Sequence, residues 1–409
     1  MMVAHELKEG VLIAWDAIRA NKMRAALTTL GIVIGIVTVT LMGTALQGLR
    51  RGFVQSISVL GTDVLYVQRF DWFINTHEEW VKQQRRREIP LQYAREIARQ
   101  MTLAQAVAPF VEGRETVRYK TQYASGVSII GSTDQFLLTG GLSVAEGRFL
   151  SVPESSGARP VCVLGSQAWT NLFKGGNALG EKVYVGGHPF EVVGVLERQG
   201  DFLGAFSLDN QVVIPIGTFT ANFDPFPDCT IQIKTVSVGV MDDAREEVRG
   251  IMRRVRHLSA NQEDDFAINQ QDQFLETFNR VAKVIASVGL FITSLSLFVG
   301  GIGIMNIMFV SVAERTKEIG IRKAIGAKRR AILLQFLTEA ASICLLGGLI
   351  GLAIAWPLTL LLGKFMPASM SPLIVAAALG VSLVTGVVAG FIPAWRAARL
   401  NPVDALRAE

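Results

Sequence analysis

The stretch VIASVGLFITSLSLFVGGIGIMNIMFVSVA, residues 284–313, contains no Asp, Glu, Lys or Arg and decides the fold class of this chain. A helix needs about 20 predominantly apolar residues to cross a bilayer, and this stretch is longer than that. Charge-free runs that are also long enough occupy residues 25–49, 340–363 and 365–395. We therefore predict an integral membrane protein with four transmembrane helices.

The overall composition agrees with a membrane protein. Of the 409 residues, 50% are hydrophobic and 18% are charged, and the 39 glycines add to the apolar share. Soluble globular domains carry about 25% charged residues. Disordered chains combine low hydrophobicity with high net charge. A wholly soluble protein and a disordered protein are both excluded.

Basic residues flank the apolar runs, and their positions predict the topology. Lys22 and Arg24 precede the first run, the segment 314–330 is strongly basic, and Arg396 and Arg399 follow the last run. Positive residues near membrane ends stay on the cytoplasmic side. We therefore expect both termini and the 314–330 segment in the cytoplasm. The net charge of +5 is explained in this way, so no nucleic-acid partner is expected.

The expected organisation follows from these runs and charges. It comprises a cytoplasmic amphipathic helix at 1–23, membrane helices at 24–49, 284–313, 331–363 and 372–395, an extracytoplasmic domain at 50–283, a cytoplasmic coupling loop at 314–330, a short external loop at 364–371 and a cytoplasmic tail at 396–409. The first run is too long for a signal-peptide core, so we predict an uncleaved helix. The helix before it is expected to lie along the membrane surface or against the protein.

The external segment alternates strand and helix patterns, which predicts an α+β domain with its own core. Strands are expected at 63–68, within 104–131, and at 160–164, 182–185, 190–196, 230–234 and 265–269, and helices at 90–101, up to 173, and at 242–258 and 274–283. Residues 69–89 are interpreted as a solvated, partly disordered excursion, with a contact for a partner or lipid headgroups as the alternative. Whether Cys162 and Cys229 form a disulfide is left open.

The motifs of the common catalytic sites are missing from the sequence. It has no G-x-x-x-x-G-K-[ST] phosphate loop, no G-x-S-x-G, no H-E-x-x-H and no C-x-x-C. The four histidines are scattered. We therefore expect no catalytic, cofactor-binding or metal site, and an energy source in another subunit or in an ion gradient.

Two features of the membrane runs bear on mechanism. Glu339 is the charged residue with apolar sequence on both sides, and it follows Arg330 by about nine residues, roughly 13 Å of helix. A proton or ion site is one interpretation. We favour a carboxylate bonded to the backbone or to nearby cations. Glycines four residues apart, at 31 and 35, 347 and 351, and 386 and 390, predict closely packed helices.

The segment NIMFVSVAERTKEIGIRKAIGAK, residues 306–328, holds charge pairs at helical spacing and a small apolar stripe of Ile321 and Ile325. Taken alone, it is typical of a solvated connector between membrane helices. It closely resembles the corresponding loop of the MacB-like permeases, which belong to the FtsX-like superfamily of type VII ABC transporters. The stretches AIRANKMR at 17–24 and PAWRAARLNPVDALR at 393–407 resemble motifs of the same family, and the resemblance covers nearly the whole chain.

The resemblance implies the permease subunit of an ABC transporter in the bacterial inner membrane. It implies a second permease copy, identical or closely related, and a separate ABC ATP-binding subunit that holds ATP and Mg²⁺. Motion would pass to an external domain with porter-like and Sabre-like parts, for export of peptides, antibiotics or similar amphipathic substrates. The residues implied at the ATPase contact are Glu314, Arg315, Lys317, Glu318, Arg322 and Lys323.

Several alternatives remain open at this stage. Many MacB proteins carry the ATPase on the same chain, and this sequence contains none, so a partner ATPase is expected. A periplasmic adaptor with an outer-membrane channel is a further open partner, and membrane lipid surrounds the helices. The alternative functions are an FtsX-like mechanotransmitter that activates an extracytoplasmic partner, a lipoprotein-extracting permease, and a sensor or ion-coupled carrier independent of ATP.

Overall fold

The computed structural model describes residues 22–57, 61–74, 76–202 and 206–407. The chain forms two compact units, which we call the helical unit (1–52 and 278–409) and the α+β unit (53–277). Residues 1–21 lie outside the described residues, and with them nearly all of the amphipathic helix expected at 1–23.

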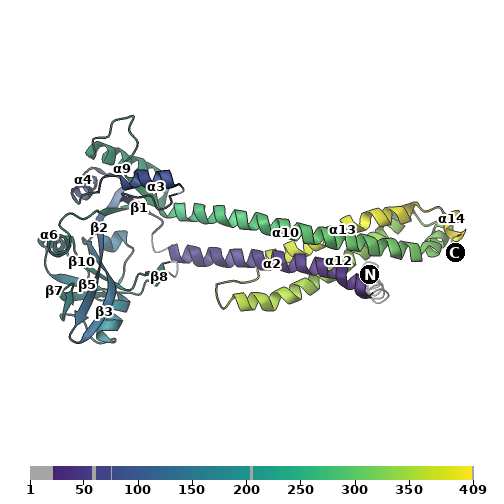
Figure 1. The fold of residues 1–409 in the computed structure, drawn as a ribbon, viewed down its shortest axis with the longest axis horizontal. Coiled ribbons are helices and arrows are strands. Elements are labelled where there is room, and N and C mark those ends of the chain that lie inside the picture. The colour runs from purple at the N-terminus through teal and green to yellow at the C-terminus, as the bar shows by residue number, and fades with distance from the viewer. Residues whose placement is uncertain (1–21, 58–60, 75, 203–205, 408–409) are drawn as a thin grey trace. The chain divides into compact units, whose positions relative to one another are not determined.

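Four described helices are long and apolar enough to cross a membrane (Figure 1). They are α2 (Lys22–Ile57), α10 (Gln271–Glu314), α12 (Arg329–Leu362) and α13 (Pro372–Arg399). α2 and α10 contain the runs 25–49 and 284–313, α12 ends one residue before the run 340–363 does, and α13 begins at Pro372, within the run 365–395. α10 is longer than its apolar run, because the helical pattern expected at 274–283 continues into that run without a break.

Glycines allow the helices of the helical unit to approach closely. A Cβ atom on Gly31 of α2 would lie 3.0 Å from the Cα of Gly300 on α10, and one on Gly351 of α12 would lie 3.0 Å from Cβ of Ile36. Between α12 and α13, the hydroxyl of Ser382 donates a hydrogen bond to the carbonyl of Cys344 at 2.5 Å. The close packing predicted from the glycine spacings is confirmed.

A ten-stranded sheet forms the centre of the α+β unit, in the order β12-β1-β11-β2-β3-β10-β5-β7-β4, with β6 paired to β2 and β7. The strands are β1 (Val64–Gln68), β2 (Ala104–Tyr119), β3 (Gln122–Ser132), β4 (Val144–Gly147), β5 (Val161–Leu164), β6 (Lys182–Val185), β7 (His188–Leu196), β10 (Gln211–Pro215), β11 (Thr230–Thr235) and β12 (Ala267–Gln270). The long strand β2 joins an antiparallel half to a half that contains parallel pairs, β3 with β10 and β5 with β7. A separate ribbon pairs β8 (Asp201–Phe202) with β9 (Phe206–Ser207).

Helices α4 (Gln92–Gln100) and α9 (Met241–Val255) pack on one face of the sheet. Ile97 and Val248 from these helices share a buried apolar core with Leu65 of β1 and Ile231 of β11. The other described helices are α3 (His77–Gln84), α5 (Phe136–Thr139), α6 (Val152–Gly157), α7 (Ser166–Phe173) and α8 (Ile216–Asn222), with a short turn η2 (Val238–Val240). The α+β domain expected from the sequence is confirmed, although β4, β10 and the short ribbon of β8 and β9 were not predicted.

Cys162 and Cys229 are both free and buried in this core, so they do not form a disulfide. Burial away from water disfavours the thiolate. It raises the pKa of the Cys162 thiol, and it raises the pKa of Cys229 to about 12. Both cysteines therefore serve as small apolar core residues.

The interpretation of residues 69–89 as solvated is confirmed for most of 76–88, which are exposed, but the partly disordered character was wrong for the described residues, which form α3 and packed contacts. The rings of Trp72 and Phe73 lie 4.8 and 4.9 Å from the ring of Phe274 at the start of α10. The side chain of Asn269 accepts a hydrogen bond from Trp72 N at 3.3 Å and donates one to Phe70 O at 2.9 Å. The aromatic partner comes from a distant part of the chain, so a local pattern did not reveal this packing.

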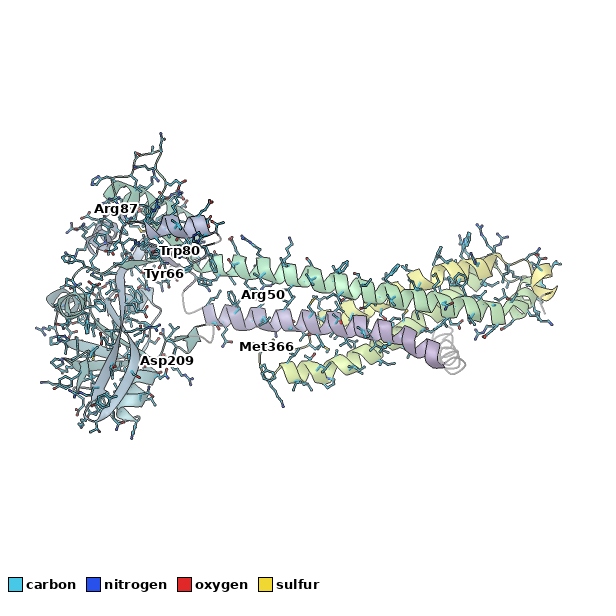
Figure 2. The ribbon with its side chains drawn as sticks, viewed as in Figure 1. Arg50, Tyr66, Trp80, Arg87, Asp209 and Met366 are labelled. Carbon is cyan, nitrogen blue, oxygen red and sulfur yellow. The ribbon has the colours of Figure 1, made fainter. Side chains whose placement is uncertain are left out.

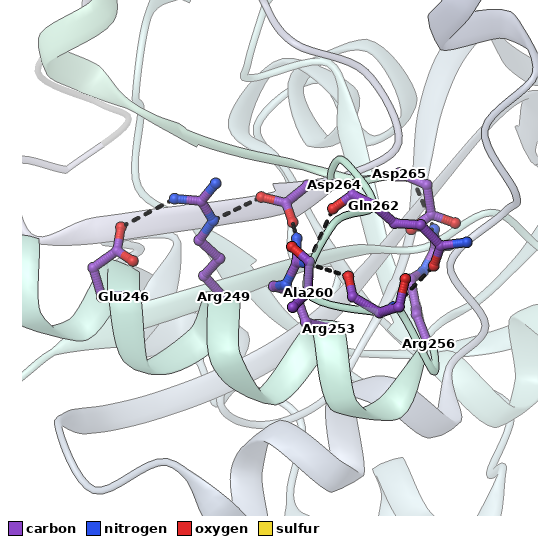
Figure 3. Close-up of polar contacts among 9 residues, drawn as sticks. Glu246, Arg249, Arg253, Arg256, Ala260, Gln262, Asp264 and Asp265 are labelled. Carbon is purple, nitrogen blue, oxygen red and sulfur yellow. Dashed lines mark hydrogen bonds and ion pairs between the residues drawn. The ribbon is translucent and has the colours of Figure 1, made fainter.

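An ion-pair network fixes the loop that follows α9 (Figure 3). Arg253 pairs with Asp264, and Arg249 Nε lies 2.7 Å from the same carboxylate. Arg256 is only 2% exposed, and its Nη1 lies 2.8 Å from Asp265 Oδ1. These charges neutralise one another within the unit, which assigns them a structural role.

Candidate functional site

The predicted coupling loop contains a short helix, α11 (Thr316–Ala324), within the helical unit. The backbone of Arg315, with φ −101° and ψ 13°, leaves the helical region and separates α11 from α10. Gly326 has a φ of +99°, a value that other residues rarely adopt, and it makes the turn toward α12. The segment is therefore a helix held between two turns.

One side of α11 packs against the membrane helices. Ile319 is 2% exposed and belongs to the apolar core that also contains Phe336 of α12 and Ala397 of α13. The last described helix, α14 (Pro402–Arg407), lies against α11. α11 is thus packed on the rest of the helical unit.

Arg315, one of the residues expected at the ATPase contact, faces α12. Its Nη1 lies 3.4 Å from Oε2 of Glu339, and Glu339 is 4% exposed. Glu339 is therefore an interior carboxylate next to a cation of the coupling segment. This agrees with the interpretation that we favoured over an ion site.

Arg322 and Lys323 also make contacts inside the helical unit. Arg322 pairs with Glu318 and donates a hydrogen bond to Gln335 of α12 at 2.9 Å. Lys323 Nζ donates to the carbonyls of Ala398 and Leu400, at 2.7 and 2.6 Å, where α13 ends. The last carbonyls of a helix have no partner within the helix, and Lys323 supplies one. Partial burial, with the charge of Arg329 nearby, lowers the pKa of Lys323.

The other side of α11 is exposed. Lys317, Glu318 and Ile321 of α11 are exposed, Ile321 at 50%, as are Glu314 at the end of α10 and Ile325 directly after α11, the latter at 81%. Residues three or four apart lie on one face of a helix, so Glu318, Ile321 and Ile325 form one stripe. We call these five residues the α11 surface. The predicted contact set omitted the isoleucines, although their spacing of four was visible in the sequence.

The α11 surface combines charges of both signs with exposed branched apolar side chains. Such a combination is suited to contact with another protein, because water is displaced from the isoleucines while the charges select the partner. In the described ranges of the chain, no group of three or more His, Cys, Asp and Glu side chains is placed to hold a metal ion. The three cations Arg315, Arg322 and Lys323 position the helix that carries the surface.

Two family models match the sequence. The MacB-like periplasmic core domain matches residues 25–251, and the FtsX-like permease C-terminal region matches residues 290–402. A solved structure of the periplasmic region of MacB from Actinobacillus actinomycetemcomitans is similar with a TM-score of 0.45 at 18% identity, over 55% of this chain and 95% of that chain.

Curated relatives match over the whole length of this chain. The macrolide export ATP-binding/permease protein MacB of Chromobacterium violaceum is 34% identical over 417 residues, which cover 100% of this chain and 62% of the relative. The pyoverdine export ATP-binding/permease protein PvdT of Pseudomonas savastanoi pv. phaseolicola is 34% identical over 415 residues, or 99% of this chain and 60% of the relative. The chain therefore spans about three-fifths of the length of these relatives.

Proposed function

Because the chain belongs to the family of MacB-like and FtsX-like permeases, multi-pass membrane components of type VII ABC transporters, we propose that a separate ATPase subunit drives it through the α11 surface. The protein has four membrane helices and an extracytoplasmic α+β domain between the first and the second. The permease itself would be non-catalytic, and ATP and Mg²⁺ would be bound by the partner. Both termini and α11 would face the cytoplasm.

The observation that supports this proposal most directly is the exposure of Ile321 and Ile325, at 50% and 81%, on and directly after a helix whose other side is anchored. Glu314, Lys317 and Glu318 would contact the ATPase directly beside them. Arg315, Arg322 and Lys323 would transmit its movement, because they bond to α12 and to the end of α13.

The cargo that we propose is an exported peptide, antibiotic or similar amphipathic molecule. The names of the relatives, a macrolide exporter and a pyoverdine exporter, favour molecules of this kind. The transporter would contain two permease copies, and a periplasmic adaptor with an outer-membrane channel would complete the export route. ATP-driven movement of the helices would reach the extracytoplasmic domain, where the cargo is handled.

The test co-expresses the full chain with a phosphate-loop ATPase encoded by a neighbouring gene and measures their association. The double variant Ile321→Asp/Ile325→Asp is expected to lose at least about tenfold in ATPase recovered by affinity pull-down, because buried apolar contacts are replaced by two desolvated charges. Val236→Asp is the matched control, since Val236 is 57% exposed in the α+β unit. Its ATPase recovery should equal that of the wild type.

The thermal unfolding midpoints of both variants are measured alongside the pull-down. The isoleucines are exposed, so the double variant is expected to unfold at the same temperature as the wild type. Full ATPase recovery and full transport by the double variant would contradict the coupling role of the α11 surface. The purified permease alone is expected to hydrolyse no ATP.

A further inference from the structure

The α+β unit contains a cavity of about 620 Å³ that has no part in the coupling contacts of α11. Small-molecule sites in proteins occupy about 300–1,000 Å³ and combine apolar walls with a few polar groups. The cavity is lined by residues of β1, β11, β2 and β3, by Trp72 and by α5, and it extends to the segment 207–211. Tyr66, on the sheet, and Asp209, in the segment that borders the cavity, are labelled in Figure 2.

The floor of the cavity is the face of the sheet opposite to α4 and α9. Side chains two residues apart on a strand share a face, and Phe110, Glu112 and Arg114 of β2 all line the cavity. Thr230 of β11 lies opposite Phe110 in the register. The residue between Phe110 and Glu112, Val111, points into the apolar core instead. This alternation buries Val111 in the core on one face of the sheet and places Phe110, Glu112 and Arg114 at the cavity on the other face.

Two aromatic pairs form the apolar part of the cavity. The rings of Tyr66 and Trp72 lie 5.1 Å apart, and those of Phe110 and Phe136 lie 5.6 Å apart. All four residues line the cavity. An aromatic ring of a ligand can pack against such pairs in an offset or edge-to-face arrangement. The pairs are therefore suited to the aromatic part of a bound molecule.

Charged groups and amides form the polar part of the cavity. Within the described residues, Arg114 is exposed and makes no hydrogen bond or ion pair, so its guanidinium is available to an anion. Glu112 accepts a hydrogen bond from Ser128 at 2.6 Å. Among the residues that the structure describes, Glu112 forms no ion pair with a cation. The amide oxygen of Gln232 accepts a hydrogen bond from Thr139 at 2.9 Å, and Gln232 lines the cavity.

We propose that this cavity binds an amphipathic, peptide-like molecule whose aromatic side chain lies against the two aromatic pairs and whose carboxylate pairs with Arg114. A guanidinium holds a carboxylate with two parallel hydrogen bonds. Glu112 and the amide oxygen of Gln232 accept hydrogen bonds from the N–H groups of the same ligand. The occupant is transported cargo only if the proposed export function holds, whereas binding itself needs no ATPase.

The test uses the full chain in lipid nanodiscs with 5-fluorotryptophan in place of its six tryptophans. The fluorine NMR resonance of Trp72 is assigned with Trp72→Phe. Two probes that differ in one group are titrated, N-acetyl-Phe-Phe with a free carboxylate and the same dipeptide as its C-terminal amide. The carboxylate is expected to shift the Trp72 resonance and to bind about tenfold more tightly than the amide.

Arg114→Gln is expected to abolish this tenfold preference. Arg118→Gln is the matched control, because Arg118 lies on the same strand but stacks on Tyr184 at 4.8 Å beside a different cavity. An unshifted Trp72 resonance with both probes, or a preference that survives Arg114→Gln, would overturn the proposal. If the carboxylate binds as expected while the α11 double variant still recruits the ATPase, the binding site stands and the coupling proposal alone fails.

Discussion

The side-chain ammonium of Lys323 lies 2.7 Å from the main-chain carbonyl of Ala398, and this contact ties α11 to the end of α13. A second carbonyl, that of Leu400, accepts from the same ammonium at 2.6 Å. Lys323 is therefore partly buried and bonded within the helical unit, not a free surface charge. A movement imposed on α11 would pass to α13 through these bonds.

Lys323→Met is expected to destabilise the helical unit by about 1–3 kcal/mol, because two partly buried carbonyls lose their donor. Lys317→Met, on the exposed side of α11, is the matched control and should leave stability unchanged. The thermal unfolding midpoint of the full chain in detergent measures both. Equal midpoints for the two variants would show that the bonds to α13 contribute no stability.

Because Arg322 and Lys323 bond within the helical unit, reversing their charges is expected to perturb folding as well as coupling to the ATPase. Such a variant therefore does not isolate the coupling step.

Glu339→Gln is expected to retain transport and to lower stability by at most about 1 kcal/mol. The side chain of Arg315 is 31% exposed, so water solvates its charge when the carboxylate becomes an amide, and the amide oxygen can still accept a hydrogen bond. Export by cells that carry the variant is the measurement. Loss of export with normal ATPase recruitment would instead favour an ion-coupled carrier.

Gly386→Ala is expected to lower the unfolding temperature, and Gly380→Ala, on the same helix, is expected to maintain or raise it. A Cβ on Gly386 would lie 2.9 Å from the carbonyl oxygen of Ala340, whereas a Cβ on Gly380 meets no described atom within 4 Å. Alanine favours a helix by about 1 kcal/mol over glycine, which is the effect left at position 380. Thermal unfolding of the two variants side by side measures the difference. A fall at position 380 equal to that at 386 would contradict close packing of α12 and α13 at Gly386.

Glu154→Gln is expected to destabilise the α+β unit at pH 7 but not near pH 2. The hydrogen bond from the Arg148 guanidinium, helped by Ser151, lowers the pKa of Glu154 from 4.5 to about 2. The stability that this carboxylate contributes is therefore present above about pH 4.5 and is lost as the pH falls through about 2. The change of this pKa from 4.5 to about 2 corresponds to about 3 kcal/mol, and water around the exposed side chain of Arg148 reduces the expected loss at pH 7 to about 2 kcal/mol.

Urea unfolding of the full chain at pH 7 and pH 2.5 measures this effect. Glu146→Gln is the control, since Glu146 is exposed on β4 and pairs with no cation among the described residues. A difference between wild type and Glu154→Gln that is as large at pH 2.5 as at pH 7 would show that the ion pair with Arg148 is not its source.

The amino-acid sequence by itself determined the four membrane helices, because the length of a charge-free run is a local property that a bilayer selects directly. It also determined most strands of the external domain and the family, through alternating patterns and motifs such as residues 306–328. The sequence also showed a charged connector at 314–330, the segment that contains α11. It did not show the division of that segment into anchored and exposed sides.

Only the tertiary structure decided which residues of that segment are available to a partner. In the sequence, three cations of that segment resemble surface charges. In the structure, Arg315 pairs with Glu339, Arg322 donates a hydrogen bond to Gln335, and Lys323 donates to carbonyls at the end of α13. The same holds for Trp72, which packs on Phe274, and for Arg114, which shares a cavity with Phe136. Each of these arrangements brings together different helices, strands or loops, and its free energy depends on the folded geometry that places them side by side.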